Sequence, residues 1–198
     1  MVDRAGSDAR RLTVDEILRE ASTLLETVRG FAPAQVLLAA DMLVSALKSR
    51  NKVLVFGNGG SASDAEHLAA ELVGRFARDR PGWPAISLTA DSSVVTAIGN
   101  DYGFDQIFAR QVEALGRQGD IAFAISTSGK SANVIAGLEA AERGGLRRIA
   151  LTGRDGGFLG RAAELQINVP HDSVPRVQEV HRTLLHVICE LVERELAG

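Results

Sequence analysis

The sequence is poor in the residues that mark disulfide-rich or aromatic-rich proteins. Among 198 residues there are one cysteine, one tryptophan, one tyrosine and five prolines. A single cysteine excludes an intrachain disulfide framework, and the apolar helical pattern around Cys189 predicts a buried core thiol. No internal repeat, low-complexity segment or linker interrupts the chain, so we expect a single domain.

The chain also lacks a strong charge of either sign and a long apolar run. Its net charge is −3 at pH 7, which does not favour binding to nucleic acid or to an anionic membrane. No apolar run approaches the length of a membrane span, and residues 1–11 (MVDRAGSDARR) lack the apolar centre of a secretory signal. We therefore expect a cytoplasmic protein with no nucleic-acid or membrane partner, and a mobile tail at residues 1–11.

Short apolar runs alternate with helical patterns along most of the chain. The runs predict strands at 53–56, 84–88, 121–125, 147–152 and 165–169. Helical patterns fill the intervals at 61–78, 92–98, 104–115 and 131–144, with a short helix after the glycines at 156–157 and a long one at 176–196. This alternation indicates an α/β fold with a mostly parallel sheet, in which ligands bind at the carboxyl ends of the strands.

Two helical patterns precede the first strand. Thr13 and Glu16 have the spacing of a capping box, which predicts a helix from there to Arg29, and Pro33 opens a second helix that reaches about Ser49. Two long amphipathic helices could form a lid, but such pairs more often pack against another subunit. We therefore expect a helical hairpin at 13–49 that takes part in oligomerisation.

The strongest functional signal is the stretch IAFAISTSGKSA at 121–132. An apolar strand ends in a turn with four hydroxyl side chains around Gly129, and a helix follows at once: the hydroxyls are those of Ser126, Thr127, Ser128 and Ser131. Free backbone amides and the helix dipole make such a helix start attractive to a phosphate group. A hydroxyl-rich cap without a ligand is the plainer alternative. A nucleotide-binding P-loop is disfavoured because its first glycine would fall at Ala124.

A second loop, Gly57-Asn58-Gly59-Gly60, follows the first strand. It matches the dinucleotide fingerprint G-x-G-x-x-A, but the acidic residue expected about 20 positions later, at the end of the second strand, is absent there, and Asp91 lies past that strand. The loop is therefore expected to surround a second part of the ligand that the serine loop holds.

Histidine and glutamate residues on two helices could carry chemistry. His67 and Glu71 are four residues apart and share one helical face. They could bind a divalent metal or move protons, although an arbitrary pair of this kind is usually a solvated surface pair. His186 lies among apolar residues of the last helix, so a core histidine is the alternative to a functional one.

Taken together, these segments resemble a known family. GNGGSASDAEHLAAEL (57–72), GND (99–101), ISTSGKSANV (125–134), LTGRDGG (151–157) and RVQEVHRTLLH (176–186) are similar to the phosphoheptose isomerases, members of the sugar isomerase (SIS) domain family. The resemblance runs from about Ala32 to the C-terminus. The serine loop alone indicates only an SIS domain, whereas H-x-x-x-E together with Q-x-x-H-x-x-x-x-H is much more specific.

The resemblance implies a fold and an activity. It implies one SIS domain at 12–198, an αβα sandwich whose five-stranded, mostly parallel sheet follows the N-terminal helical hairpin. It implies conversion of D-sedoheptulose 7-phosphate to D-glycero-D-manno-heptose 7-phosphate through an enediol, the first step of nucleotide-activated heptose synthesis. It also implies a homotetramer with sites at subunit boundaries.

The resemblance further assigns roles to single residues. Glu71 would be the general base and His186 its acid/base partner. The zinc site of some members would correspond to His67, Glu71, Gln178 and His186. The implied substrate contacts are Asn58, Gly59, Gly60, Glu71, Asn100, Asp101, Ser126, Thr127, Ser128, Ser131 and Gln178. Because Gln178 and His186 are about 12 Å apart along a straight helix, one ion shared by both would require inward-leaning side chains, a bent helix or two subunits.

Two other functions remain open from the sequence. A non-catalytic SIS relative binds the bacterial replication initiator, but it is expected to lack the catalytic glutamate and histidine, which this chain has as Glu71 and His186. A sugar-phosphate-sensing domain is the other alternative, and such domains are usually fused to a DNA-binding segment.

Overall fold

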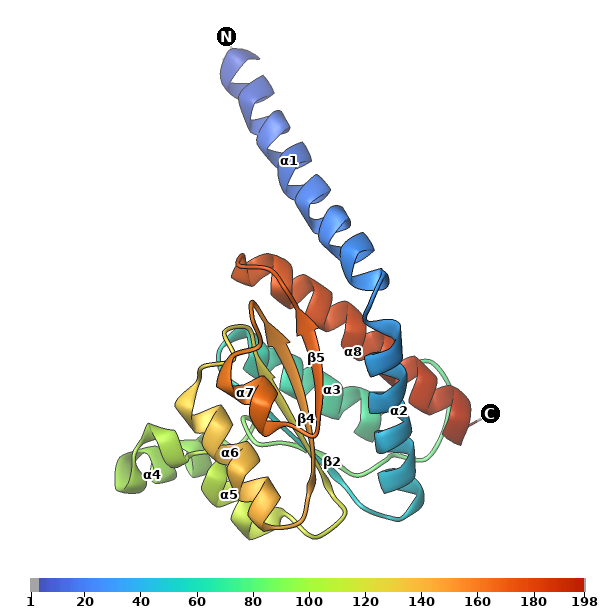
Figure 1. The fold of residues 1–198 in the computed structure, drawn as a ribbon, viewed down its shortest axis with the longest axis vertical. Coiled ribbons are helices and arrows are strands. Elements are labelled where there is room, and N and C mark those ends of the chain that lie inside the picture. Colours follow the sequence, from blue (N-terminus) through green and yellow to red (C-terminus); the bar gives the residue numbers. More distant parts are fainter. Residues whose placement is uncertain (1–3, 198) are drawn as a thin grey trace.

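A five-stranded parallel sheet forms the centre of the molecule (Figure 1). The computed structural model describes residues 4–197, with side chains from residue 8 onwards. The strands follow the order β2-β1-β3-β4-β5 and every pair is parallel, as the sequence predicted. Their bounds are β1 (Val53–Gly57), β2 (Ala85–Ser87), β3 (Ile121–Ser126), β4 (Arg147–Gly153) and β5 (Leu165–Val169).

Helices cover both faces of this sheet and complete the expected αβα sandwich. Their bounds are α1 (Arg4–Arg29), α2 (Pro33–Lys48), α3 (Gly60–Val73), α4 (Ser92–Tyr102), the 3₁₀ turn η1 (Phe104–Gln106), α5 (Ala109–Leu115), α6 (Ala132–Arg143), α7 (Gly157–Ala162) and α8 (Val174–Leu196). The core between the sheet and α2, α3 and α8 is one apolar cluster, and α5, α6 and α7 enclose a second cluster on the other face.

The alternation of side chains along each strand divides the core between the two faces. In β1, Val53 and Val55 belong to the α2–α3–α8 side, whereas Leu54 and Phe56 belong to the α5–α6–α7 side. All four are fully buried, and each such side chain contributes roughly 1.5–3 kcal/mol on leaving water. Cys189 of α8 is buried among apolar residues, which confirms it as a core thiol.

The first helix differs from the prediction because it begins at Arg4 rather than at Thr13. The Thr13 hydroxyl donates to the Ala9 carbonyl inside the helix, so the predicted capping box does not start it. Residues 4–12 contain alanine, arginine and leucine, which favour helix, and no proline, so the helix extends backwards in spite of the weaker helix formers Gly6, Ser7 and Asp8. Residues 4–11 are therefore helical. The mobility predicted for the tail stays a prediction, and residues 1–3 lie outside the described part.

The two N-terminal helices meet at a bend of 72° instead of lying side by side. Figure 1 shows α1 projecting beyond the body of the molecule, while α2 packs beside α8. No single helix within residues 4–197 is long and apolar enough to cross a membrane, and the bent α1–α2 pair meets that test by length and composition only.

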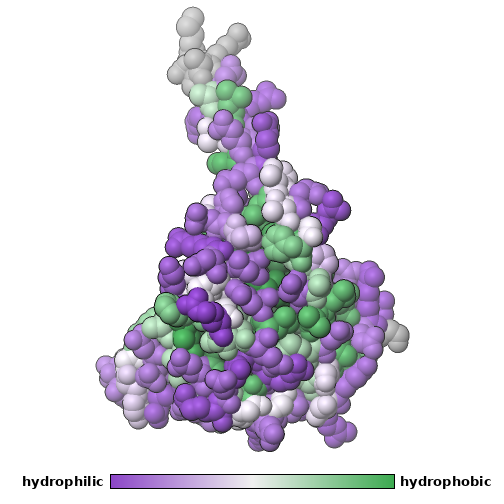
Figure 2. Space-filling view, viewed as in Figure 1, coloured by the Kyte–Doolittle hydropathy of each residue, from purple (hydrophilic) through white to green (hydrophobic). Residues whose placement is uncertain are grey.

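Several large apolar side chains of α1 have no covering layer in this chain. Leu12, Val14, Ile17 and Leu18 are all exposed, and Figure 2 shows hydrophobic residues on the projecting part of the molecule. Below them, α1, α2 and α8 border an apolar groove of about 490 Å³, lined by residues such as Val28, Leu37 and Val187.

Two other predicted boundaries were wrong. The helix expected to run to residue 78 ends at Val73, and an irregular segment then leads to β2. Residues 99–102, expected to form a turn, are the last turn of α4, because Gly103 with φ of 88° ends the helix instead of Gly99.

Candidate active site

The hydroxyl groups of the serine loop, residues 126–131, gather at the carboxyl end of β3. The Ser126 Oγ atom lies 3.4 Å from Ser128 Oγ and 3.2 Å from Ser131 Oγ. The Gly129 amide donates to Ser126 Oγ at 3.2 Å, and the Lys130 amide donates to Ser128 Oγ at the same distance. Three hydroxyls thus gather around Ser126, and the binding of a phosphate to them stays a prediction.

Gly129 and the start of α6 keep this cradle open to an anion. Gly129 has a φ of 62°, and a Cβ atom there would lie 2.2 Å from the Gly156 carbonyl oxygen, so only glycine fits. Ser131 is the N-cap residue of α6, but its side chain makes no capping hydrogen bond. The Val134 amide donates to the Ser131 carbonyl at 3.1 Å, whereas no side chain caps the start of the helix, which carries partial positive charge.

The glycine loop, residues 57–60, lies next to the serine loop. β1 and β3 are neighbours, with Gly57 opposite Ile125, so the loops that follow them emerge side by side. Asn58 joins the two: its side-chain amide and that of Asn133 exchange hydrogen bonds of 2.8 and 3.0 Å. Asn133 is 2 % exposed. Sequence reasoning missed it, although a polar residue in the first turn after the loop was the available signal.

Gln178 of α8 lies against the start of α3. A Cβ atom added to Gly60 would lie 2.2 Å from the Gln178 side-chain nitrogen, so the absence of a side chain at Gly60 permits this contact. Gly60 precedes His67 by seven residues, which is about 10 Å along α3. Gln178 therefore lies beside the glycine loop, two helical turns from His67.

Three possible metal ligands meet between α3 and α8. The Nε2 atoms of His67 and His186 are 2.7 Å apart, and Glu71 Oε1 lies 3.2 Å from His67 Nε2. One ligand atom from each residue falls within 4.8 Å of the others. Two imidazoles and a carboxylate are a donor set that Zn²⁺ takes in catalytic sites, so these residues fit such an ion. His186 is partly buried and lies in this cluster, so it is not enclosed in the apolar core, and its role stays a prediction.

Comparisons with known proteins identify the family. A family model described as "SIS domain" matches residues 16–153. A phosphoheptose isomerase of Geotalea uraniireducens is 50 % identical over 188 residues, which cover 93 % of this chain and 100 % of the relative. One of Aquifex aeolicus is 52 % identical over 180 residues, covering 91 % and 94 %. The chain belongs to the phosphoheptose isomerases of the SIS domain family.

A solved structure agrees with this membership. The phosphoheptose isomerase of Neisseria gonorrhoeae superposes with a TM-score of 0.88 at 41 % identity, covering 93 % of this chain and 98 % of that one. The protein is therefore an isomerase, and the two loops and the histidine–glutamate cluster of this phosphoheptose isomerase are its candidate catalytic machinery.

Buried charges next to the cluster set its electrostatics. Asp64, one turn before His67 on α3, is 3 % exposed, and Arg182 of α8 donates to its Oδ1 atom at 2.8 Å. Burial raises the pKa of Asp64 although Arg182 acts against it. Partial burial, followed by the positive charge of Arg182, lowers the pKa of His67. His67 is thereby favoured in the neutral form that can donate a lone pair to a metal.

The deeply buried histidine of this phosphoheptose isomerase is His181 rather than His186. His181 is fully buried, its Nε2 atom lies 2.9 Å from the Thr152 carbonyl oxygen, and burial lowers its pKa to about 4. His181 and His186 occupy one helix, yet only the second reaches the cluster. Helical position, which the apolar pattern did not resolve, separates the core histidine from the histidine in the cluster.

Two of the implied substrate contacts do not join the rest of the site within one chain. Asn100 and Asp101 lie on α4, both are exposed, and the Asn100 side chain donates to Asp101 at 2.8 Å. Figure 1 shows α4 at the outer edge beside α5 and α6, away from α8. No side chain of α4 is buried. Thr127, in contrast, is partly buried within the serine loop.

Proposed function

We propose that this phosphoheptose isomerase converts D-sedoheptulose 7-phosphate to D-glycero-D-manno-heptose 7-phosphate, the first step toward nucleotide-activated heptose, and that it acts in the cytoplasm. The observation that carries the proposal is the meeting of His67, Glu71 and His186 on two helices of a chain that also gathers hydroxyl groups in the serine loop. A ketose–aldose exchange needs one group that moves a proton between two carbons and another that moves a proton between their oxygens. The cluster offers residues of both kinds.

In the proposed complex the serine loop holds the phosphate. Hydroxyls of Ser126, Ser128 and Ser131 and the free amides at the start of α6 supply donors at fixed positions. Thr127 would add a fourth hydroxyl. The glycine loop, with Asn58, Gly59 and Gly60, would contact the sugar chain, and Gln178 is placed against Gly60 to do the same. Binding the phosphate at one end fixes the register of the sugar and so orients its reacting carbons.

Glu71 is the proposed general base. Its carboxylate would take the proton from C1 of the ketose while the C2 carbonyl becomes a hydroxyl, which gives the enediol. Return of the proton to C2 and loss of the hydroxyl proton at C1 gives the aldehyde. His186 would carry the proton between the two oxygens. Together these proton transfers rearrange the substrate without adding or removing any atom.

A divalent ion, proposed to be zinc, would be held by His67, Glu71 and His186. Gln178, the fourth ligand implied by the family, lies against Gly60 in this chain and would reach the ion only after a change of side-chain position or from another subunit. When bound, such an ion supplies Lewis-acid polarisation of the substrate carbonyl. The chain's own residues favour its binding, because the lowered pKa of His67 keeps this imidazole unprotonated near neutral pH.

We further propose a homotetramer in which the active site is completed between subunits. Three features support this: the uncovered apolar side chains of α1, the exposed Asn100 and Asp101, and the separation of about 10 Å along α3 between Gly60 and His67. A neighbouring chain could cover α1 and bring α4 of one subunit to the cluster of another.

The direct test is incubation with sedoheptulose 7-phosphate while aldose formation is followed, with and without a chelator. We expect turnover by the untreated enzyme and, if zinc takes part, loss of turnover with the chelator that added Zn²⁺ reverses. An inert enzyme with native folding and metal content would refute the proposal. It would then favour the non-catalytic role of binding the replication initiator, which the presence of Glu71 and His186 now disfavours.

A further inference from the structure

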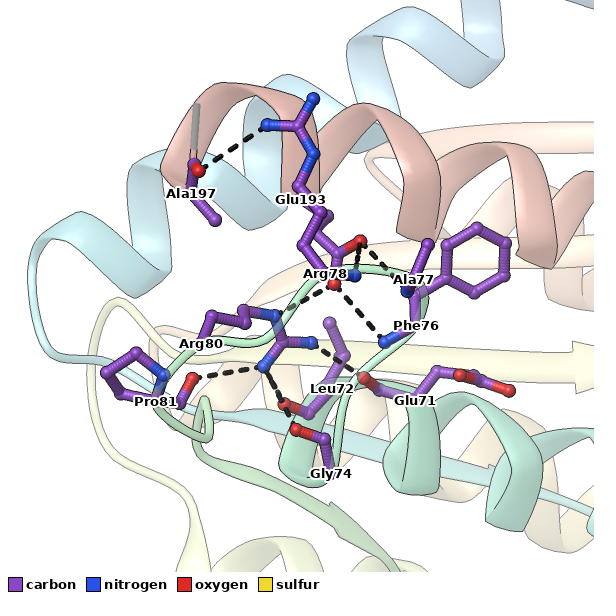
Figure 3. Close-up of polar contacts among 10 residues, drawn as sticks. All are labelled: Glu71, Leu72, Gly74, Phe76, Ala77, Arg78, Arg80, Pro81, Glu193 and Ala197. Atoms are coloured by element: carbon purple, nitrogen blue, oxygen red, sulfur yellow. Dashed lines mark hydrogen bonds and ion pairs between the residues drawn. The ribbon is translucent and has the colours of Figure 1, made fainter.

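The segment that links α3 to β2 is folded around one buried carboxylate, that of Glu193 on α8. Glu193 is 2 % exposed. Its Oε2 atom accepts hydrogen bonds of 2.9 Å from the amides of Ala77 and Arg78, and its Oε1 atom accepts bonds of 3.2 Å from the Phe76 amide and the Arg80 guanidinium (Figure 3). Four donors from one short segment thus converge on a single side chain.

Arg80 connects this carboxylate to the end of α3. Its guanidinium donates to the carbonyl oxygen of Glu71 at 2.7 Å and to that of Leu72 at 2.9 Å. Two weaker bonds reach the carbonyls of Gly74 and Pro81. These carbonyls belong to or follow the last turn of α3, where no helical amide is available to them, so Arg80 caps the helix that carries Glu71. Arg80 also stacks on Trp83, the only tryptophan, at 3.5 Å.

The same segment touches the second helix of the cluster. The Phe76 ring packs against the His186 ring with centroids 5.7 Å apart, and the His186 ring in turn meets the His67 ring at 4.9 Å. His186 and Glu193 are seven residues apart and therefore lie on one face of α8. One short segment thus contacts the backbone of Glu71 and the side chain of His186.

The charge on Glu193 holds this arrangement together. Burial alone would raise the pKa of Glu193, but the amides of Ala77, Arg78 and Phe76, together with Arg80, lower it overall. The carboxylate therefore remains ionised at neutral pH and accepts all four bonds. A neutral group there would leave backbone amides and the Arg80 charge without a full partner in a buried place.

We infer that Glu193 and Arg80 are positioning residues that set the relative placement of Glu71 and His186. This inference rests on the proposed isomerase function and adds to it a pair that touches neither substrate nor metal. Glu193 holds residues 76–80 to α8, Arg80 anchors the end of α3, and Phe76 limits the orientation of the His186 ring. A purely structural pair would instead change the stability of the fold and leave the turnover of folded enzyme unchanged.

Glu193→Gln tests the inference, and Glu190→Gln is its control. The glutamine keeps the shape but removes the charge, and Glu190 is an exposed glutamate one turn earlier on α8, paired with Arg194. At a temperature where circular dichroism shows folded protein, we expect kcat of Glu193→Gln for sedoheptulose 7-phosphate to fall roughly 10–100-fold, as for a small misplacement of catalytic groups. KM should change less than about twofold, because the phosphate loop is untouched. Glu190→Gln should match the wild type.

Phe76→Leu provides a second variant in case Glu193→Gln does not fold. The Phe76 ring is partly exposed, so its loss should leave the fold intact while freeing the His186 ring. We expect its kcat to fall in the same direction by roughly tenfold, with KM again unchanged. Native kcat in a folded Glu193→Gln, or in Phe76→Leu if the former does not fold, would overturn the inference.

Failure of the proposed function would be recognised separately, because wild-type enzyme would then not turn over. In that case calorimetric titration with Zn²⁺ decides. A loss of affinity of roughly 10–100-fold in Glu193→Gln but not in Glu190→Gln, typical of groups that orient metal ligands, would uphold the positioning role. Equal affinities, or a wild type that binds no Zn²⁺, would overturn it.

Discussion

The serine loop and the histidine–glutamate cluster are built in opposite ways. The loop gathers its hydroxyls from six consecutive residues at one strand–helix junction. The cluster joins His67 and His186, which are 119 positions apart, across the interface of α3 and α8. The loop needs only a strand that ends and a helix that begins, whereas the cluster needs two helices held in register.

The two regions also differ in what supports them. β3, which carries the serine loop, is buried along its whole length. The cluster is partly exposed, and it is flanked by the buried ion pair Arg80–Glu193 and by the partly buried pair Asp64–Arg182. We therefore expect changes in the loop to weaken substrate binding and changes in the cluster to slow turnover. The predictions below test this division, beginning with the largest effect.

Glu71→Gln should have the largest effect on turnover, because it changes the proposed base of the histidine–glutamate cluster. The amide keeps the shape and removes the base, so turnover should fall by about 10²–10⁴-fold or more while substrate still binds. Steady-state kinetics and binding calorimetry would measure both, with Glu139→Gln, an exposed glutamate on α6, as the control. Near-native turnover would end the assignment of Glu71. In the wild type, solvent deuterium should enter C1 or C2 during turnover unless the base shields its proton from exchange.

Replacing Ser126 and Ser128 together by alanine tests whether the serine loop governs substrate binding. Each lost hydrogen bond to a charged phosphate costs about 1.5–3 kcal/mol, so KM should rise at least tenfold while kcat changes much less. Ser45→Ala, on the exposed side of α2, is the matched control. An unchanged KM in the double variant would remove the loop from the substrate site. A comparable fall in kcat would break the division between the two regions.

Deleting residues 1–30 should reveal whether the two regions work in one subunit or between subunits. Loss of α1 removes the apolar residues Leu12, Val14, Ile17 and Leu18, which have no cover in a single chain. We expect the mass from light scattering to fall and activity to fall with it. A native protein that is already monomeric would contradict the proposed assembly. Mixing Glu71→Gln subunits with Ser126/Ser128 double-alanine subunits should restore part of the activity only if sites are shared.

His181→Gln should have the smallest effect, visible only on acidification. The pKa of His181 is about 4 in the folded protein against an ordinary value of 6.5, so protonation favours the unfolded chain. The wild type should lose stability as pH falls from about 6.5 to 4, by roughly 3 kcal/mol in total. Glutamine can still donate to the Thr152 carbonyl. Urea unfolding at several pH values should show a shallower loss in the variant, and identical slopes would contradict the prediction.

Local patterns predicted much of this protein correctly. The strands, both loops and the gathering of hydroxyls around Gly129 follow from apolar runs that stop at glycine and serine. The prediction was wrong where a distant group decides the local outcome. α3 was expected to continue to residue 78, but Gly74 ends the helix and Glu193, more than a hundred residues later, takes the amides of the following segment. The start of α1 was misjudged because a local capping signal does not stop a helix that can extend.

By itself, the sequence determined the alternation of strands and helices, the hydroxyl-rich turn between β3 and α6, and the residue types available for proton transfer. These depend on backbone preferences and on groups that are neighbours in the chain. Only the tertiary structure decided which histidine of α8 joins His67 and Glu71, which one is buried in the core, and that Gln178 lies at the glycine loop. These outcomes depend on the rotation and spacing of α3 against α8. The packed core, the buried Arg80–Glu193 pair and the partly buried Asp64–Arg182 pair set that geometry through contacts between distant residues.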